Sequence, residues 1–380
     1  MENNDRSLAL VMSGGGARAA YQIGFLQCLA KHKKEIHFPI ITGVSAGAIN
    51  AAFLANEKDS FHKRIDALAS IWSRLTIDDV FRVDPASIAK HVVFWAVRLM
   101  LGRASSQVKI RAMVDTAPLR EFLGKVLKND NGYLTGIRAN LDDEDLRGIA
   151  LTASNYSSGQ SITWVQGQDV RHWQRAHRKS VETEVNIDHI MASASLPLFF
   201  PAICVDGQWY GDGGIRLTAP LSPAIHLGAR RIIAISTRYQ PDEAEQGMDM
   251  IDDYPPPAQV VGAMFNAIFL DVFDNDALRL ERINSLLNDQ EESADQDLEK
   301  VKLLLFRPSE NLGQMANRFE PRLPTTFRFM TRGLGTGETR SNDMLSMVMF
   351  QHDYIEALMD MGYRDAEARL DEILAFFTED

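Results

Sequence analysis

Short apolar runs separated by glycine-rich turns dominate the first 60 positions of the chain. Residues 7–12 form an apolar run that ends at three successive glycines, and residues 17–31 follow with small and apolar residues at helical spacing. Residues 39–41 form a second run, which a turn at 42–47 joins to a helical segment at 48–54. Strand, glycine turn and helix, twice in this order, predict a parallel sheet covered by helices.

The sequence continues as mixed α/β up to about residue 240 and is mainly helical beyond that point. Further strands are predicted at 148–154, 161–165, 203–210, 231–236 and 301–306. We therefore expect residues 1–240 to form an α/β domain with a mainly parallel central sheet flanked by helices. Residues 241–380 are expected to be a mainly helical C-terminal region that completes this domain or packs on it.

The composition is that of an ordinary soluble globular protein, with 45% hydrophobic and 24% charged residues among 380. A net charge of −11 argues against a global attraction to nucleic acid. Cys28 and Cys204 are expected to be free thiols. The chain begins without a basic and apolar signal sequence and contains no run of about 18 apolar residues, so a cytoplasmic location is the simplest expectation.

The strongest chemical motif is Gly43-Val44-Ser45-Ala46-Gly47, which lies between a predicted strand and a predicted helix. In that context, G-x-S-x-G forms a nucleophile elbow, a sharp turn that exposes the serine hydroxyl while Gly43 and Gly47 relieve crowding. The amides at the start of the helix point at Ser45 and favour negative charge there. The alternative is an ordinary turn with a solvated serine.

An earlier turn, Gly14-Gly15-Gly16-Ala17-Arg18, is suited to binding an anion. Successive glycines let backbone N–H groups converge on one point, here the oxyanion of acyl transfer. A nucleotide phosphate fits less well, because the turn lacks the third glycine of G-x-G-x-x-G and no Gly-Lys-Ser/Thr follows. Arg18 either holds the loop or meets a phosphate group.

A serine nucleophile needs a base. The nine histidines lie outside comparably constrained turns, and His172, His177 and His226 are expected to be surface or packing residues. Asp212 instead ends a predicted strand, and Gly213 and Gly214 follow it and allow close approach of the backbone. An aspartate in an ordinary β-turn is the alternative.

Taken together, these motifs resemble those of the patatin-like phospholipases, which are serine lipid acyl hydrolases with a Ser-Asp dyad. The matching segments are Gly14-Gly15-Gly16-x-Arg18, Gly43-x-Ser45-x-Gly47, Asp212-Gly213-Gly214 and a further motif, Ala192-Ser193-x-Ser195-x-Pro197. The resemblance covers residues 7–237. It implies the three-layer patatin-type α/β fold and a phospholipid or lysophospholipid as substrate.

The resemblance also implies a role for each residue. Ser45 attacks the acyl carbonyl and carries the acyl-enzyme, and Asp212 takes the serine proton and later activates water. The oxyanion hole is formed by Gly14, Gly15, Gly16, Ala17 and Arg18, and no cofactor or metal is implied. Because a free aspartate has a pKa of about 3.9 and is a weak base, we expect Asp212 to be buried beside Ser45.

Two other functions are compatible with parts of the sequence. A Ser-His-Asp esterase shares the nucleophile elbow, but it expects several strands before the serine and a histidine late in the chain. A catalytically silent lipid-binding protein of the same fold is the second alternative, since a fold does not guarantee activity.

Residues 87–111 combine basic and apolar side chains in an otherwise acidic protein, with Val93, Trp95 and Leu99 among the apolar ones. This pattern suits either peripheral contact with a membrane or a cap helix packed on the sheet. A second basic cluster at 171–179 is suited to binding phosphate headgroups and less to nucleic acid, but a solvated loop is the default expectation. The acidic segment 242–254 is expected to be an exposed loop that gates the site.

Overall fold

The computed structural model describes most of the chain. It covers residues 5–33, 36–82, 112–241, 256–269, 271–289, 299–324, 327–328, 332 and 341–378. The segment 87–111 and the acidic segment 242–254, with the expectations about them, lie outside the described residues.

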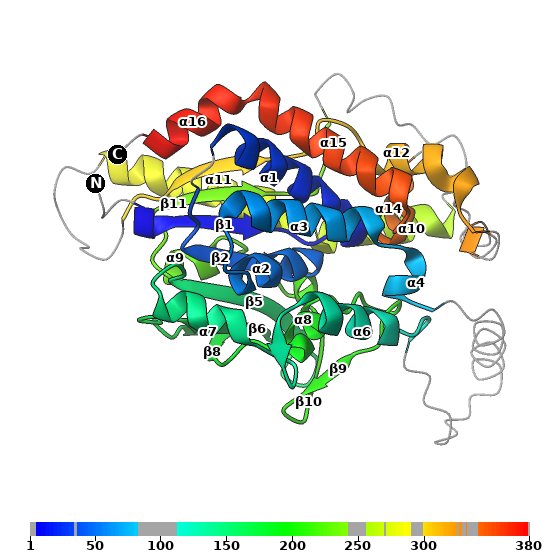
Figure 1. Cartoon of the computed structure of the whole chain (residues 1–380), viewed down its shortest axis with the longest axis horizontal. Coiled ribbons are helices and arrows are strands. Elements are labelled where there is room, and N and C mark those ends of the chain that lie inside the picture. Colours follow the sequence, from blue (N-terminus) through cyan, green and yellow to red (C-terminus); the bar gives the residue numbers. More distant parts are fainter. Residues whose placement is uncertain are drawn as a thin grey trace.

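A ten-stranded sheet forms the centre of the molecule (Figure 1). Five of its strands are parallel neighbours, in the order β12 (Lys302–Phe306), β11 (Arg231–Ile235), β1 (Leu8–Met12), β2 (Ile40–Val44) and β5 (Gly148–Asn155). The predicted strands in this part of the chain are therefore confirmed. The last of them, β12, shows that the C-terminal region contributes a strand to the same sheet.

Beyond β5 the sheet becomes mixed. The strands β6 (Ser161–Gly167), β7 (Gln174–Arg175), β8 (Arg178–Glu182), β9 (Ile203–Val205) and β10 (Gln208–Asp212) include four antiparallel pairings. The expectation of a solvated loop at 171–179 is wrong for β7 and β8, because β8 pairs with β6. The single strand expected at 203–210 is a hairpin, whose turn residues Asp206 and Gly207 both have positive φ, as tight hairpin turns require.

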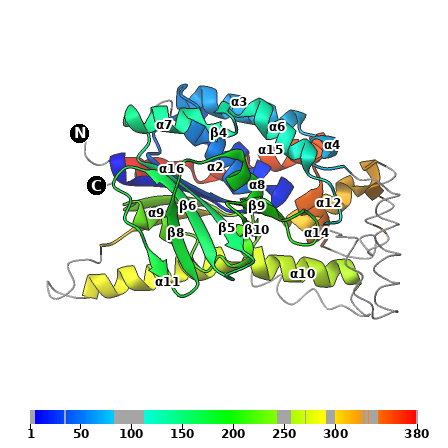
Figure 2. The same ribbon diagram turned by 90° about the horizontal axis from the view of Figure 1, so that it is seen from below.

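Helices cover both faces of the sheet, which gives three layers (Figure 2). Along β1, the side chains of Leu8, Leu10 and Met12 join one buried cluster and those of Ala9 and Val11 join another, because successive side chains of a strand point to opposite faces. The first cluster packs against α1 (Ala20–His32), α2 (Ala46–Asn56), α3 (Phe61–Arg74) and α15 (His352–Ala368), and the second against α9 (Ser222–His226) and α11 (Asp271–Asp289). The expected three-layer α/β fold is confirmed.

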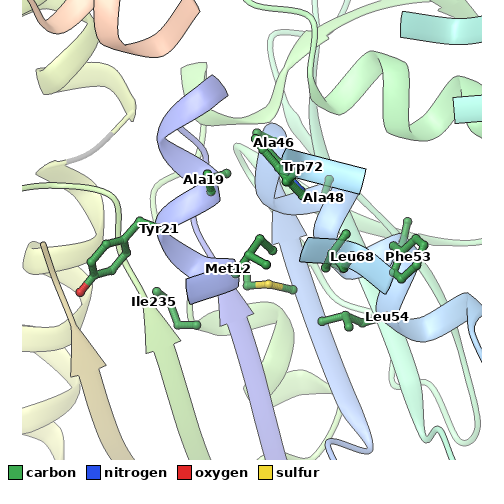
Figure 3. Close-up of a cluster of buried hydrophobic side chains, with 14 of the residues drawn as sticks. Met12, Ala19, Tyr21, Ala46, Ala48, Phe53, Leu54, Leu68, Trp72 and Ile235 are labelled. Atoms are coloured by element: carbon green, nitrogen blue, oxygen red, sulfur yellow. The ribbon is translucent and has the colours of Figure 1, made fainter. Parts of the chain in front are cut away.

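Helices α1 and α15 pack unusually closely because each supplies a glycine. A Cβ atom on Gly24 would lie 1.7 Å from the carbonyl oxygen of Met359, and one on Gly362 would lie 2.0 Å from that of Tyr21. Figure 3 shows part of the core beside them, with Met12 and Ile235 from the sheet and Phe53 and Leu68 from the covering helices. Helix α15, from the C-terminal region, is thus built into the core of the domain.

The remaining helices and strands complete the described structure. They are η1 (Asp5–Ser7), η2 (Gly16–Ala19), α4 (Ile77–Val80), α6 (Ala117–Val126), β3 (Asn129–Asp130), β4 (Tyr133–Leu134), α7 (Thr135–Asp142), α8 (Ile187–Ser193), η3 (Gly213–Ile215), α10 (Pro257–Phe269), α12 (Leu312–Phe319), η4 (Glu320–Arg322), α14 (Asp343–Val348) and α16 (Leu370–Thr378). Within the described ranges, none of the helices combines the length and the apolar character that crossing a bilayer demands.

Candidate active site

Ser45 occupies a strained turn between β2 and α2. Its backbone angles are φ 57° and ψ −131°, a region that a residue with a Cβ atom rarely adopts. This conformation is the one that a nucleophile elbow imposes on its serine. The side chain lies at the N-terminus of α2, whose dipole favours negative charge, and Ser45 is only 6% exposed.

Gly47 is one of the elbow positions that leave no room for a side chain. A Cβ atom there would lie 2.4 Å from the carbonyl oxygen of Ser13 and 2.5 Å from that of Met12. We expect Gly47→Ala to lower the free energy of unfolding by about 1–3 kcal/mol, because the end of β1 must shift. Urea unfolding monitored by circular dichroism measures the change.

Gly124, in the last turn of α6, provides the matched control for that substitution. The only atom recorded within 4 Å of an added Cβ is Ile187 Cδ1, at 3.9 Å. Gly124→Ala should therefore raise the free energy of unfolding by up to about 1 kcal/mol, since alanine is the better helix former. Equal effects of the two alanines would contradict the close packing described for the elbow.

The sheet brings Asp212 to Ser45 although 167 positions separate them in the sequence. Strand β2 pairs with β5 as far as Val44 opposite Thr152. At the next residue of β5, Ala153, strand β10 takes over the pairing with Asp212. A Cβ atom on Gly213 would lie 2.6 Å from Val44 Cγ2, so a glycine is needed where the two strand ends meet. Both side chains named from the sequence are therefore brought together.

The carboxyl group of Asp212 is completely buried, as expected. Its Oδ1 accepts a hydrogen bond from the Gly214 amide at 2.9 Å, while among the described residues no donor forms a hydrogen bond with Oδ2. Burial raises the pKa of Asp212 to about 7, and the neighbouring Ser45 hydroxyl and the Gly214 amide limit the rise. A carboxylate with a pKa near neutrality is a far better base than a solvated one.

Helix α8 and the residues after it hold both members of the pair. The Ser45 amide donates to Ser193 Oγ at 3.0 Å, and Ser193 Oγ donates to the Thr152 carbonyl at 2.6 Å. The Asp212 amide donates to the Ser195 carbonyl at 2.9 Å. The sequence singled out Ser193 and Ser195 as a motif, but only the structure shows that they fix the backbone of the nucleophile and of the acid.

The glycine loop lies against the serine. Gly15 and Gly16 have φ values of 135° and 58°, which explains why glycine is needed there. A Cβ atom on Gly14 would lie 3.3 Å from Ser45 Oγ. Thr237, which the sequence did not indicate, lies two residues after β11 and holds the loop. Its Oγ1 donates to the Gly14 carbonyl at 2.6 Å, and its amide donates to Ser13 Oγ at 3.0 Å.

The members of the expected oxyanion hole differ in their surroundings. Within the described residues, no protein acceptor is recorded for the amides of Gly14 and Gly15. The Arg18 amide, in contrast, donates to the Gly15 carbonyl at 3.2 Å. The Arg18 side chain points to the C-terminal helix α14, where it forms an ion pair with Asp343. Of the two roles expected for Arg18, the structure shows the one that holds the loop.

An apolar cavity of about 60 Å³ extends from Ser45. At the serine it is bounded by Gly15, Gly16 and Ala46, and elsewhere by apolar side chains. These come from α2, α3, α4, α6 and the segment after α8, and include Ile49, Phe53, Leu68, Ile71, Trp72, Leu119, Phe122, Leu123, Leu196 and Phe200. Met347, Val348 and Phe350, from the C-terminal region, close one side. The sequence did not indicate which residues line this cavity.

No histidine of the described residues lines this cavity. His189 lies at the start of α8, where its ring packs 4.4 Å from Trp164 and burial lowers its pKa to about 4. His226 stacks on Trp173, and His172 pairs with Glu182 on the surface. His226 and His172 thus have a packing role and a surface role, as the sequence suggested, and His189 has a packing role.

The chain is similar to known proteins in sequence and in structure. The rat patatin-like phospholipase domain-containing protein 7 (Rattus norvegicus) is 25% identical over 231 residues, which are 60% of this chain and 13% of that protein. The chain thus spans about an eighth of that relative.

Solved structures give matches of low sequence identity. Human GIVD cytosolic phospholipase A2, in complex with methyl gamma-linolenyl fluorophosphonate, has 13% identity and a TM-score of 0.45, covering 98% of this chain and 59% of that one. VipD from Legionella pneumophila has 15% identity and a TM-score of 0.32, covering 97% and 75%.

The sequence of the chain also matches a protein family as a whole, and this match is the one that identifies it. Residues 10–225 match the patatin-like phospholipase family, which is more than half of the 380 residues. The matched range contains the glycine loop, the elbow serine and Asp212, so the resemblance noted in the sequence is confirmed. The chain belongs to the patatin-like phospholipase family.

Proposed function

We propose that this protein is a serine lipid acyl hydrolase that cleaves fatty-acyl esters of phospholipids or lysophospholipids through a Ser45–Asp212 dyad. The observation that carries the proposal is the burial of Asp212 beside the strained Ser45, with a pKa raised to about 7. A buried carboxyl costs stability, and an active site is where such a cost is commonly found. The family membership supports the same reaction.

In the first half of the reaction, Ser45 Oγ attacks the acyl carbonyl carbon while Asp212 accepts the hydroxyl proton. The tetrahedral intermediate collapses by breaking the bond to the leaving alcohol, which takes the proton from Asp212. In the second half, Asp212 accepts a proton from water as the water attacks the acyl-serine. The intermediate then releases the fatty acid, and Ser45 regains its proton from Asp212.

The oxyanion of both intermediates is stabilised by the glycine loop in this proposal. Among the residues that the structure describes, no protein acceptor meets the amides of Gly14 and Gly15, and both lie on the loop that contacts Ser45. Ala46 follows the nucleophile, and its amide lies at the start of α2, the usual place for a second donor. Removing one such donor from a hydrolase costs about 100- to 1000-fold in rate.

The apolar cavity is proposed to bind the acyl chain, and Ile71 offers a test. Its half-buried side chain lines the cavity from α3. Ile71→Trp should fill part of the space and reduce kcat/KM about 10-fold for a long-chain ester. This is the size of the loss expected when a few methylene groups of the substrate no longer bind in an apolar pocket. Hydrolysis of an acetyl ester should change little. A matched substitution on the surface, Leu286→Trp, should affect neither substrate.

The proposal as a whole is tested by the products. Purified protein is incubated with vesicles of a single phospholipid, and the lipids are analysed by mass spectrometry. Release of one fatty acid with one lysophospholipid per cleaved molecule supports the proposal. An unchanged phospholipid together with measurable vesicle binding would instead favour the catalytically silent lipid-binding alternative.

A further inference from the structure

Arg18 lies at the end of the glycine loop, and the residue is 2% exposed. Its Nε donates to Ser346 Oγ at 2.6 Å, and its Nη2 donates to Asp343 Oδ1 at 2.6 Å and to the Asp343 carbonyl at 3.1 Å. Ser346 Oγ in turn donates to the Asp343 carbonyl at 2.7 Å. One guanidinium group is therefore fixed by three bonds to a single turn of α14. We name Arg18, Asp343 and Ser346 the loop clamp.

Helix α14 also touches the loop directly. A Cβ atom on Gly16 would lie 2.1 Å from the Met347 carbonyl oxygen, so the two backbones are in close contact. Met347 and Val348 also line the cavity that Gly15 and Gly16 border. The same short helix therefore contacts the loop and contributes to the cavity wall.

The residues that match the family end at position 225, more than a hundred positions before α14. Helix α14 therefore contacts the glycine loop although it lies outside the residues that match the family. We infer that the loop clamp positions the oxyanion-binding amides of the glycine loop, so that Asp343 and Ser346 control the rate of acyl transfer through Arg18. This inference rests on the proposed function and makes α14 part of the catalytic unit.

The clamp acts by position and not by charge. A free guanidinium near the loop would stabilise an oxyanion electrostatically, but Asp343 neutralises Arg18 at 2.6 Å. Action by charge and action by position predict opposite changes in kcat for one substitution, Asp343→Asn. If charge were important, Asp343→Asn would unmask the cation and preserve or raise kcat. If position is important, the same substitution loosens the loop and lowers kcat.

The experiment compares Asp343→Asn, Ser346→Ala and Arg18→Lys in the full chain, with kcat and KM measured on one ester. We expect kcat to fall about 10- to 100-fold for Asp343→Asn and Arg18→Lys, the effect of misplacing catalytic groups by about 1 Å. Lysine keeps the charge but cannot reproduce the fork of bonds that arginine makes. KM should stay within about threefold, and the Arg18→Lys/Asp343→Asn double variant should be no slower than the slower single variant.

Asp353→Asn is the matched control, because it removes the acid from an Arg322 ion pair elsewhere in the C-terminal region. It should leave kcat unchanged. The rate is expressed per folded molecule, with the folded fraction taken from circular dichroism, so that a loss of stability is not counted as a loss of rate. An unchanged or raised kcat for Asp343→Asn, or rate losses that add fully in the double variant, would overturn the inference. A wild-type protein without hydrolytic activity would instead reject the proposed function.

Discussion

Ser45→Ala and Asp212→Asn are each expected to reduce ester hydrolysis by about 10⁴-fold or more. Alanine removes the only nucleophile at the elbow, and asparagine keeps the shape of the side chain but removes its basicity. Nucleophile and base act as one unit in such enzymes, so combining the two substitutions should cost little more than either one alone. The measurement is the initial rate at which the coloured alcohol is released from a chromogenic fatty-acyl ester. The rate is normalised to the amount of folded protein.

Ser157→Ala is the matched control for these variants. Ser157 is exposed in the turn between β5 and β6, in the same part of the sheet as the site. Its replacement should leave the rate within about twofold, since surface substitutions away from special features have small effects. Residual turnover above 1% of wild type in Ser45→Ala would show that another group is the nucleophile.

The second large effect expected is an increase in stability. Asp212→Asn should raise the free energy of unfolding at pH 8 by up to about 4 kcal/mol, although it abolishes activity. The carboxyl has a pKa of about 7 in the folded protein, compared with about 3.9 when solvated. Above pH 7 the native state must hold a buried charge that the unfolded state solvates freely, and asparagine removes this cost.

The sign of the pH dependence follows from the direction of that shift. Between about pH 4 and pH 7 the native carboxyl keeps a proton that the unfolded one has lost, so the contribution of Asp212 to stability falls as the pH rises through this window. The advantage of Asp212→Asn should be near zero at pH 4 and reach its full size above pH 7. Urea unfolding of both proteins at pH 4, 6 and 8 measures it.

Asp206→Asn serves as the control for that series. Asp206 is exposed in the hairpin turn just before β10, and asparagine tolerates its positive φ. Its effect on the free energy of unfolding should stay within about 0.5 kcal/mol at every pH. Equal stability of wild type and Asp212→Asn at pH 8 would show that the carboxyl is not held in a low-dielectric site.

Local patterns were sufficient to predict the elements that position the nucleophile. The apolar runs before Gly14 and Gly43 are strands that lie side by side, and each is followed by a helix, because strand, glycine turn and helix is a local pattern. The burial of Asp212 was predicted from a chemical need, since an exposed aspartate is a weak base. These features depend on neighbouring residues or on the reaction itself.

Features that depend on pairing over long sequence distances were not predicted. Strand β8 reads as a basic loop because its side chains are polar, and only its pairing with β6 makes it a strand. Thr237 and Asp343 carry no motif, yet one holds Gly14 and the other holds Arg18. Ser193 was part of a recognised motif, but its bond to the Ser45 amide follows only from the packing of α8 against the ends of β2 and β5.

The rate at which a fluorophosphonate reacts with the protein, measured against pH, tests the central claim most directly. The reagent reports on an activated serine, and mass spectrometry of the digested protein locates the phosphonyl group. We predict a single adduct on Ser45, formed at a rate that rises with pH through an apparent pKa near 7 as Asp212 loses its proton. An adduct on another residue, or a rate on Ser45 that Asp212→Asn leaves unchanged, would contradict the assignment of these two side chains as nucleophile and base.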